Sequence, residues 1–325
     1  ASEASASPLI VRLKESGQAF ALYLKLMFAP SGLHMERTLA GVPASLAIAG
    51  WVFIVLFIAI AFAAYRAKRH RLAFALGFFL ITWLPISGIF PLNAPMAEHW
   101  MYLPMLGFVW ALLEVVWMVV GGGPLRYAAY ALCYVACLVF VLNTAHRNYD
   151  WRNNESLYVA TLLENPDSIR VNFNLGVTYE DLTGNSSGAR REFERVLALY
   201  RDRKAAEGKT GQTEMFYDDE MEAHLSLGKL YANQQMASQA AYHFEALRRV
   251  DVNESNAEII GSGYMEYIKL LLSLGRAEDA RKLFEEGAGR VPALKQQKEA
   301  VDRLKQSGTH DRPPTGAPSI ESPGG

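Results

Sequence analysis

The stretch that decides the fold is "ASLAIAGWVFIVLFIAIAFAAY" (residues 44–65), which contains no charged side chain. A helix needs about 20 mostly apolar residues to cross the hydrocarbon core of a bilayer. Three later stretches, at 72–92, 100–120 and 125–145, meet the same requirement. Pro85 and Gly88 are expected to kink the final turns of the stretch at 72–92. A globular core would not need four consecutive runs of this length. The sequence therefore predicts a four-span transmembrane domain over residues 44–145.

Upstream of the first span, residues 8–30 are apolar but are interrupted by charges, among them Arg12, Lys14 and Lys25. This pattern favours an amphipathic helix that lies in the membrane interface, so residues 1–43 are predicted to form an interfacial segment. A fifth, poorly formed transmembrane helix over residues 8–30 is the alternative.

The orientation in the membrane follows from the basic loop "RAKRHR" (66–71) between the first two spans. Loops rich in Lys and Arg stay on the cytoplasmic side. The link at 93–99 is then expected on the outer side, the turn at 121–124 inside, and everything after His146 outside. The second half of the chain is therefore predicted to be extracytoplasmic.

Composition excludes several kinds of site. The chain is 51% hydrophobic with a net charge of -1, which gives no reason to expect a nucleic-acid partner. Cys133 and Cys137 are its two cysteines and lie in an apolar run, so a disulfide framework is excluded. His224, His243 and His310 do not have the spacing of zinc ligands. The residues predict no metal site and no evident cofactor.

The charged half of the chain contains a repeat, seen in 172–199, 223–250 and, with Tyr267-Ile268 in place of a Leu-Gly pair, 263–292. It resembles the tetratricopeptide repeat, in which each unit is two antiparallel helices. The predicted fold class is all-α, with four or possibly five transmembrane helices followed by a tetratricopeptide-repeat solenoid at 146–306 and a disordered tail at 307–325. The concave face of such a solenoid is expected to bind a protein or peptide. The predicted core residues are Leu175, Gly176, Tyr179, Ala189, Phe193, Leu227, Gly228, Tyr231, Ala240, Phe244, Ala280 and Phe284.

Polar residues gather where the third span begins, in "NAPMAEHWMYLPMLGF" (93–108). Trp100 and Tyr102 fit an aromatic belt at headgroup level, and Glu98 and His99 would then be solvated neighbours. The alternative is a site for a lipid phosphate or an acceptor, formed by Glu98, His99 and Tyr102, with His99 as donor and Glu98 orienting it. Deeper in the same span, Glu114 is expected to pair with Arg126, because an acid inside a bilayer needs a partner.

Three stretches carry a resemblance to a known family: residues 93–108, "ALYLKLMFAP" (21–30) and "RNYDWRNNESLYVATLLENPDSIRVNFNLGVTYEDLTG" (147–184). The resemblance extends over about residues 10 to 290. The chain resembles bacterial multi-pass membrane proteins with C-terminal tetratricopeptide repeats. These look like the transmembrane-and-tetratricopeptide-repeat O-mannosyltransferases of the C-type glycosyltransferase superfamily. The resemblance implies a polyprenyl-phosphate sugar donor, an extracytoplasmic acceptor protein and a bacterial inner membrane.

Family members are similar in carrying their characteristic acidic residues on a first outer loop, and no stretch of this chain matches that loop. The chain is therefore expected to be the C-terminal portion of such an enzyme, with the catalytic acids outside it. A non-enzymatic, membrane-anchored repeat scaffold for an envelope complex is the second hypothesis.

Overall fold

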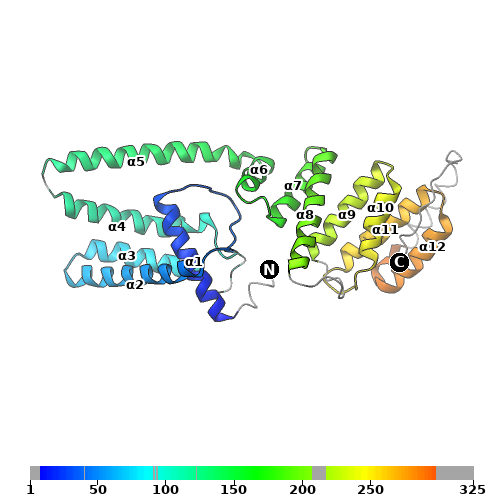
Figure 1. The fold of residues 1–325 in the computed structure, drawn as a ribbon, viewed down its shortest axis with the longest axis horizontal. Coiled ribbons are helices and arrows are strands. Elements are labelled where there is room, and N and C mark those ends of the chain that lie inside the picture. The colour runs from blue at the N-terminus through cyan, green and yellow to red at the C-terminus, as the bar shows by residue number, and fades with distance from the viewer. Residues whose placement is uncertain are drawn as a thin grey trace. The chain divides into compact units, whose positions relative to one another are not determined.

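The computed structural model describes residues 8–39, 41–90, 92, 94–121, 123–206 and 217–297. Within these residues the protein is all-helical, with twelve α-helices and no strand. The chain divides into two compact units between Pro166 and Asp167 (Figure 1), later than the boundary expected at residue 146.

Three helices of the first unit are long and apolar enough to cross a membrane: α2 (Ala44–Arg66), the helical stretch Glu98–Val120, and α5 (Leu125–Asn148). The stretch Glu98–Val120 consists of a short 3-10 helix, η2 (Glu98–Met101), followed by α4 (Tyr102–Val120). These three correspond to the first, third and fourth of the predicted spans.

The second predicted span is shorter than expected. The α-helix α3 (His70–Trp83) continues only as the 3-10 turn η1 (Leu84–Ile86), so the helix does not reach residue 92. Pro85 cannot donate a backbone hydrogen bond to a continuing helix. Gly88 then adopts a φ of 77°, which takes the chain out of the helical region. The sequence-based bounds of this element were therefore wrong at their C-terminal end.

Helix α1 (Leu9–Phe28) packs into the core of the first unit rather than lying apart from it, although it is not one of the three long apolar helices. Phe20 is 1% exposed, and its ring meets the ring of Trp83 edge-on, with the two ring centroids 4.8 Å apart. Figure 1 shows α1 crossing the ends of α2, α3 and α4 at a steep angle. Its two ends are tied to the link between α3 and α4, because Arg12 donates to the Ile89 carbonyl and Tyr23 bonds to Ala97.

Two glycines allow α1 and α2 to touch at their backbones. A methyl group built on Gly50 would overlap the carbonyl oxygen of Gly17, and one built on Gly17 would overlap the carbonyl oxygen of Ala47. The indole nitrogen of Trp51 donates to the Leu13 carbonyl beside this crossing, at 2.9 Å. Small residues at a helix crossing permit such close approach in membrane proteins.

The second unit is built from helices that pack on their sequence neighbours, and Figure 1 shows them as a row of hairpins. The pairs are α7 with α8, α9 with α10, and α11 with α12. A short 3-10 helix, η4 (Pro292–Gln297), follows the last pair. The helix bounds are Ile169–Asp181, Ser186–Ala206, Asp218–Asn233, Ala237–Arg248, Ala257–Ser273 and Ala277–Arg290.

The first two hairpins use the same glycine–phenylalanine contact. A methyl group built on Gly176 would lie 2.7 Å from the Phe193 ring, and one built on Gly228 would overlap the Phe244 ring. Phe193 and Phe244 are 0% and 2% exposed. Each glycine therefore leaves the space that the aromatic ring of the facing helix fills.

The third hairpin lacks this contact. Ile268 stands where the other hairpins have glycine and is itself fully buried, so its side chain takes up the space. Phe284, at the position of the buried rings, is only half-buried as a result. The other eleven predicted core residues are all buried.

Two segments predicted from the sequence lie partly or wholly outside the residues that the structure describes. The charged insertion predicted from residue 201 begins as helix, because α8 continues to Ala206; residues 207–216 lie outside the described part. The segment after Gln297, which includes the predicted tail at 307–325, also lies outside it.

Candidate functional site

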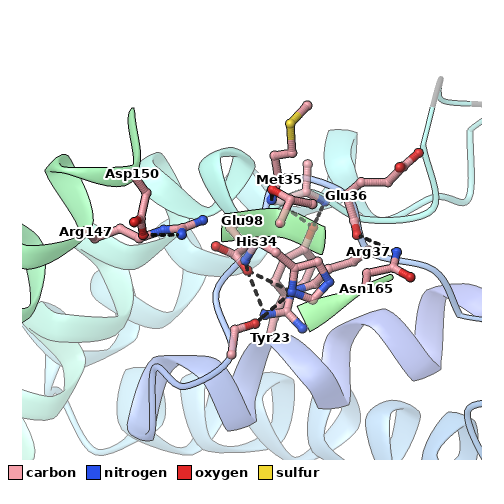
Figure 2. Close-up of polar contacts among 12 residues, drawn as sticks. Tyr23, His34, Met35, Glu36, Arg37, Glu98, Arg147, Asp150 and Asn165 are labelled. Atoms are coloured by element: carbon pink, nitrogen blue, oxygen red, sulfur yellow. Dashed lines mark hydrogen bonds and ion pairs between the residues drawn. The ribbon is translucent and has the colours of Figure 1, made fainter. Parts of the chain in front are cut away.

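The carboxylate of Glu98 is held by the loop between α1 and α2 (Figure 2). Arg37 donates to Glu98 Oε1 through Nε at 2.8 Å and forms an ion pair with it at 2.7 Å. The backbone N–H of His34 donates to the same oxygen at 3.0 Å. Both partners of this ion pair are largely buried, so solvent screens it less than a surface pair.

The loop that supplies Arg37 is itself fixed from two sides. Arg37 and the Nδ1 of His34 both bond to the Gly32 carbonyl, at 2.7 and 2.8 Å. On the other side lies α6 (Asn154–Glu164), whose Thr161 hydroxyl accepts from the Met35 backbone. Asn165, just after α6, donates to the Glu36 carbonyl at 3.4 Å. These contacts explain why α6 belongs to the first unit.

Tyr23 fixes the backbone next to Glu98. Its hydroxyl donates to the Ala97 carbonyl at 3.1 Å and accepts from the Ala97 N–H at 2.9 Å, and both residues are buried. Arg37 thus holds the side chain of Glu98 (Figure 2), and Tyr23 holds the backbone of the preceding residue, Ala97. Sequence reasoning missed Tyr23, His34 and Arg37. The sequence signal that could have pointed to Arg37 is its position as a lone cation shortly before the uncharged stretch at 44–65.

The structure does not bring the three predicted site residues together. The described hydrogen bonds of Glu98 go to Arg37 and His34, not to His99. His99 is exposed and its ring meets Trp100 edge-on at 6.0 Å. Tyr102 is 81% exposed. Glu98 is therefore a largely buried anchor beside an exposed imidazole.

The block "RNYDWRNNES" (147–156) has a structural explanation. Arg147 and Asp150 form an ion pair at 2.6 Å where α5 ends. Asn153 caps α6 by accepting from the Ser156 N–H, while the Ser156 hydroxyl accepts from the Asn153 N–H, which is a capping box. The block therefore sets the turn from α5 into α6.

Other polar residues of the spans have partners different from those expected. Glu114 accepts from the indole nitrogen of Trp110 at 3.3 Å, and Arg126 donates to the Tyr127 hydroxyl at 2.9 Å. The expected pairing of Glu114 with Arg126 was therefore wrong, because each finds a neighbour on its own helix. Cys133 and Cys137 are free thiols on α5. Within the described residues no group of three or more His, Cys, Asp and Glu side chains is placed to hold a metal ion.

The second unit contains a histidine pair that sequence spacing did not reveal. His224 on α9 and His243 on α10 are both buried, with their Nδ1 atoms 2.9 Å apart, so one ring donates to the other. The ring of Tyr231 stacks on the ring of His243, with the two ring centroids 5.6 Å apart. Burial lowers the pKa of His224 to about 3, helped by the neighbouring His243, and lowers the pKa of His243 to about 4.

We expect this pair to make the stability of the second unit sensitive to mild acid. In the unfolded chain a histidine has a pKa of about 6.5, so between about pH 6.5 and 4 the unfolded state binds protons that the folded state does not. We expect the free energy of unfolding of a fragment starting at Asp167 to fall by roughly 1–2 kcal/mol per histidine between pH 7 and 5. Urea unfolding followed by circular dichroism measures this. A His224→Leu/His243→Leu double variant should lose that slope, and an equal slope in both proteins would contradict the assignment.

Comparisons with known proteins place similarity on both units. The chain is 22% identical over 233 residues to the mouse (Mus musculus) protein O-mannosyl-transferase TMTC3, which covers 68% of this chain and 23% of that protein. It is 26% identical over 201 residues to mouse protein O-mannosyl-transferase TMTC4, covering 57% of this chain and 26% of that protein. The Drosophila melanogaster protein O-mannosyl-transferase Tmtc3 is 24% identical over 170 residues.

No protein-family model matches the chain, and no solved structure does. The chain spans about a quarter of the length of the first of these relatives. Three of its helices are long and apolar enough to cross a membrane, which indicates membrane association. The chain is distantly similar to the protein O-mannosyltransferases.

Proposed function

We propose that this chain is the C-terminal portion of a membrane glycosyltransferase that takes its sugar from a polyprenyl phosphate. Its helical hairpins are tetratricopeptide repeats that bind an acceptor protein on their concave face. The observation that carries this proposal is the similarity to protein O-mannosyltransferases, which runs through 233 residues and so includes residues of both units. The catalytic acids lie outside this chain.

In this proposal the link before α4 is where the lipid-linked donor is held. His99 is exposed there and donates to the lipid phosphate, while Tyr102 lies at headgroup level. Glu98 does not touch the donor; it positions the link, because Arg37 and Tyr23 hold it and its neighbour. The membrane is the bacterial inner membrane, and the repeats are on its extracytoplasmic side with the acceptor.

Substitutions of His99 and of Glu98 are expected to affect sugar transfer in different ways. In membranes containing the full-length protein, we expect His99→Ala to raise the KM for the polyprenyl-phosphate sugar roughly tenfold, since a charge-assisted hydrogen bond to phosphate is worth about 1.5–3 kcal/mol. Arg37→Gln is expected to lower transfer by displacing Glu98, and Glu98→Gln should do the same. Transfer of labelled sugar to protein measures these effects, with abundance checked by immunoblot.

Lys68→Gln provides the control, because Lys68 is exposed in the basic loop between α2 and α3. Wild-type transfer by both His99→Ala and Glu98→Gln at normal abundance would leave the link as an interfacial anchor only.

The second candidate function is a membrane-anchored scaffold without enzyme activity, and the row of helical hairpins in the second unit is the observation that favours it. In that case the full-length protein would bind its envelope partner and transfer no sugar from any lipid-linked donor.

A further inference from the structure

Three buried hydrogen-bond donors have no partner among the described residues: the Nε of Arg12, the hydroxyl of Ser16 and the indole nitrogen of Trp83. Ser16 is 1% exposed and Trp83 is 3% exposed. A buried donor left unsatisfied costs folding free energy, and most buried polar groups in proteins are therefore paired. These three donors are called the donor seam below, and each would be satisfied by a group that accepts hydrogen bonds.

The three donors lie where α1 packs against the end of α3. Arg12 and Ser16 are one turn apart on the same face of α1, and Phe20, one turn further, meets the Trp83 ring at 4.8 Å. Arg12 also donates through its NH1 nitrogen to the Ile89 carbonyl at 3.0 Å, which holds its guanidinium against the residues that follow Trp83. The donor seam is thus bounded by residues 12–20 on one side and 83–89 on the other.

The positive charge of Arg12 indicates that the ligand is an anion. Arg12 is partly buried, and the one described hydrogen bond of its side chain goes to a neutral carbonyl rather than to a carboxylate. A buried charge is normally paired, and a guanidinium matches the oxygens of a phosphate particularly well. A hydroxyl and an indole N–H add two more donors and no negative charge. Water could satisfy the donors one by one but would leave the charge of Arg12 unpaired.

The position of the seam indicates where such a phosphate would come from. Figure 1 shows α1, the helix of Arg12, crossing the ends of α2, α3 and α4. Trp83 is the last residue of α3, and Arg12 bonds to Ile89 in the link that follows it. The ends of membrane helices lie at the level of the lipid headgroups. We propose that Arg12, Ser16 and Trp83 bind the phosphate group of an anionic lipid. The inference deepens the proposed function, on which it rests for the choice of a lipid-linked phosphate, but the binding is tested without any transfer reaction.

The test uses the full chain in neutral detergent micelles, with the indole nitrogens labelled with nitrogen-15. The protein has six tryptophans, and the resonance of Trp83 is the one that disappears in Trp83→Phe. Short-chain phosphatidic acid and inorganic phosphate are titrated in separate experiments. We expect the Trp83 N–H resonance to move saturably downfield with phosphatidic acid, because its donor gains an acceptor, and to need far more inorganic phosphate for the same change.

Variants identify the ligand's partners. Arg12→Gln should weaken binding of phosphatidic acid roughly tenfold or more, and Ser16→Ala, which leaves the packing almost unchanged, several-fold. Lys14→Gln is the matched control: Lys14 is an exposed cation on the same helix that points away from the seam, so binding should stay within about twofold.

Equal binding of inorganic phosphate and phosphatidic acid, both weakened by Arg12→Gln, would keep the phosphate site but overturn its assignment to a lipid. A Trp83 resonance that neither probe moves, or that moves equally in Ser16→Ala and Lys14→Gln, would overturn the site itself. Sugar transfer could be present or absent in either case, so failure of this inference is distinguishable from failure of the proposed function.

Discussion

Replacing Phe244 with alanine is expected to lower the free energy of unfolding of a fragment starting at Asp167 by about 3–5 kcal/mol. The ring of Phe244 is 2% exposed and fills the space left by Gly228 on the facing helix. Its removal leaves a cavity that glycine cannot fill. Urea unfolding followed by circular dichroism measures the change.

The chain contains its own control for this prediction. Phe284 occupies the same place in the third hairpin but is half-buried, because Ile268 has taken up the space. Phe284→Ala should therefore cost clearly less than Phe244→Ala, since less apolar surface is lost from the interior. Equal costs for the two substitutions would show that the packing of these hairpins has been misassigned.

The second large effect is expected at the crossing of α1 and α2. Gly50→Ala places a methyl group against the carbonyl oxygen of Gly17, and backbone atoms cannot move aside as a flexible side chain can. We expect a loss of about 1–3 kcal/mol from overpacking, seen as earlier thermal unfolding of the full chain in detergent. The expected consequence is that α1 separates from α2 and loosens the loop that holds Glu98.

Gly77→Ala is the matched control, because a methyl group at this position on α3 meets no heavy atom within 4 Å. There the substitution should be neutral or should stabilise by up to about 1 kcal/mol, through the better helix propensity of alanine. A Gly50→Ala protein that unfolds together with or after Gly77→Ala would contradict the close crossing.

The helical character of the chain and three of its long apolar helices could be predicted from sequence, because both depend on composition and local periodicity. The second span was predicted to run to residue 92 with a kink from Pro85 and Gly88 in its final turns, whereas the α-helix α3 ends at Trp83, before both residues. Eleven of the predicted core residues of the second unit are buried, and a small residue facing an aromatic one is the recurring pattern that pointed to them. Phe284 departs from it through one substitution on another helix, at Ile268.

The candidate site was harder to predict because its contacts join distant parts of the chain. Glu98 is held by Arg37, 61 positions earlier in the sequence, and its neighbour Ala97 by Tyr23, 74 positions earlier. The sequence-based prediction paired Glu98 with His99 because the two are adjacent in the chain, and the sequence does not show contacts between distant residues. The same limit hid the pairing of His224 with His243, which depends on how α9 and α10 face each other.

The central claim of this account is that the link before α4 and the repeats lie on the same, outer side of the membrane, where donor and acceptor can meet. Cysteine labelling in intact cells tests it most directly, with both native cysteines replaced and single cysteines introduced at Pro95, Ser186 or Ser238, and at Lys68 for the opposite side. All four positions are exposed within their units.

A membrane-impermeant maleimide should label Pro95→Cys, Ser186→Cys and Ser238→Cys in intact cells, and Lys68→Cys only after lysis. Labelling of Lys68→Cys in intact cells, with the repeat positions protected until lysis, would contradict the orientation and the proposed meeting of donor and acceptor.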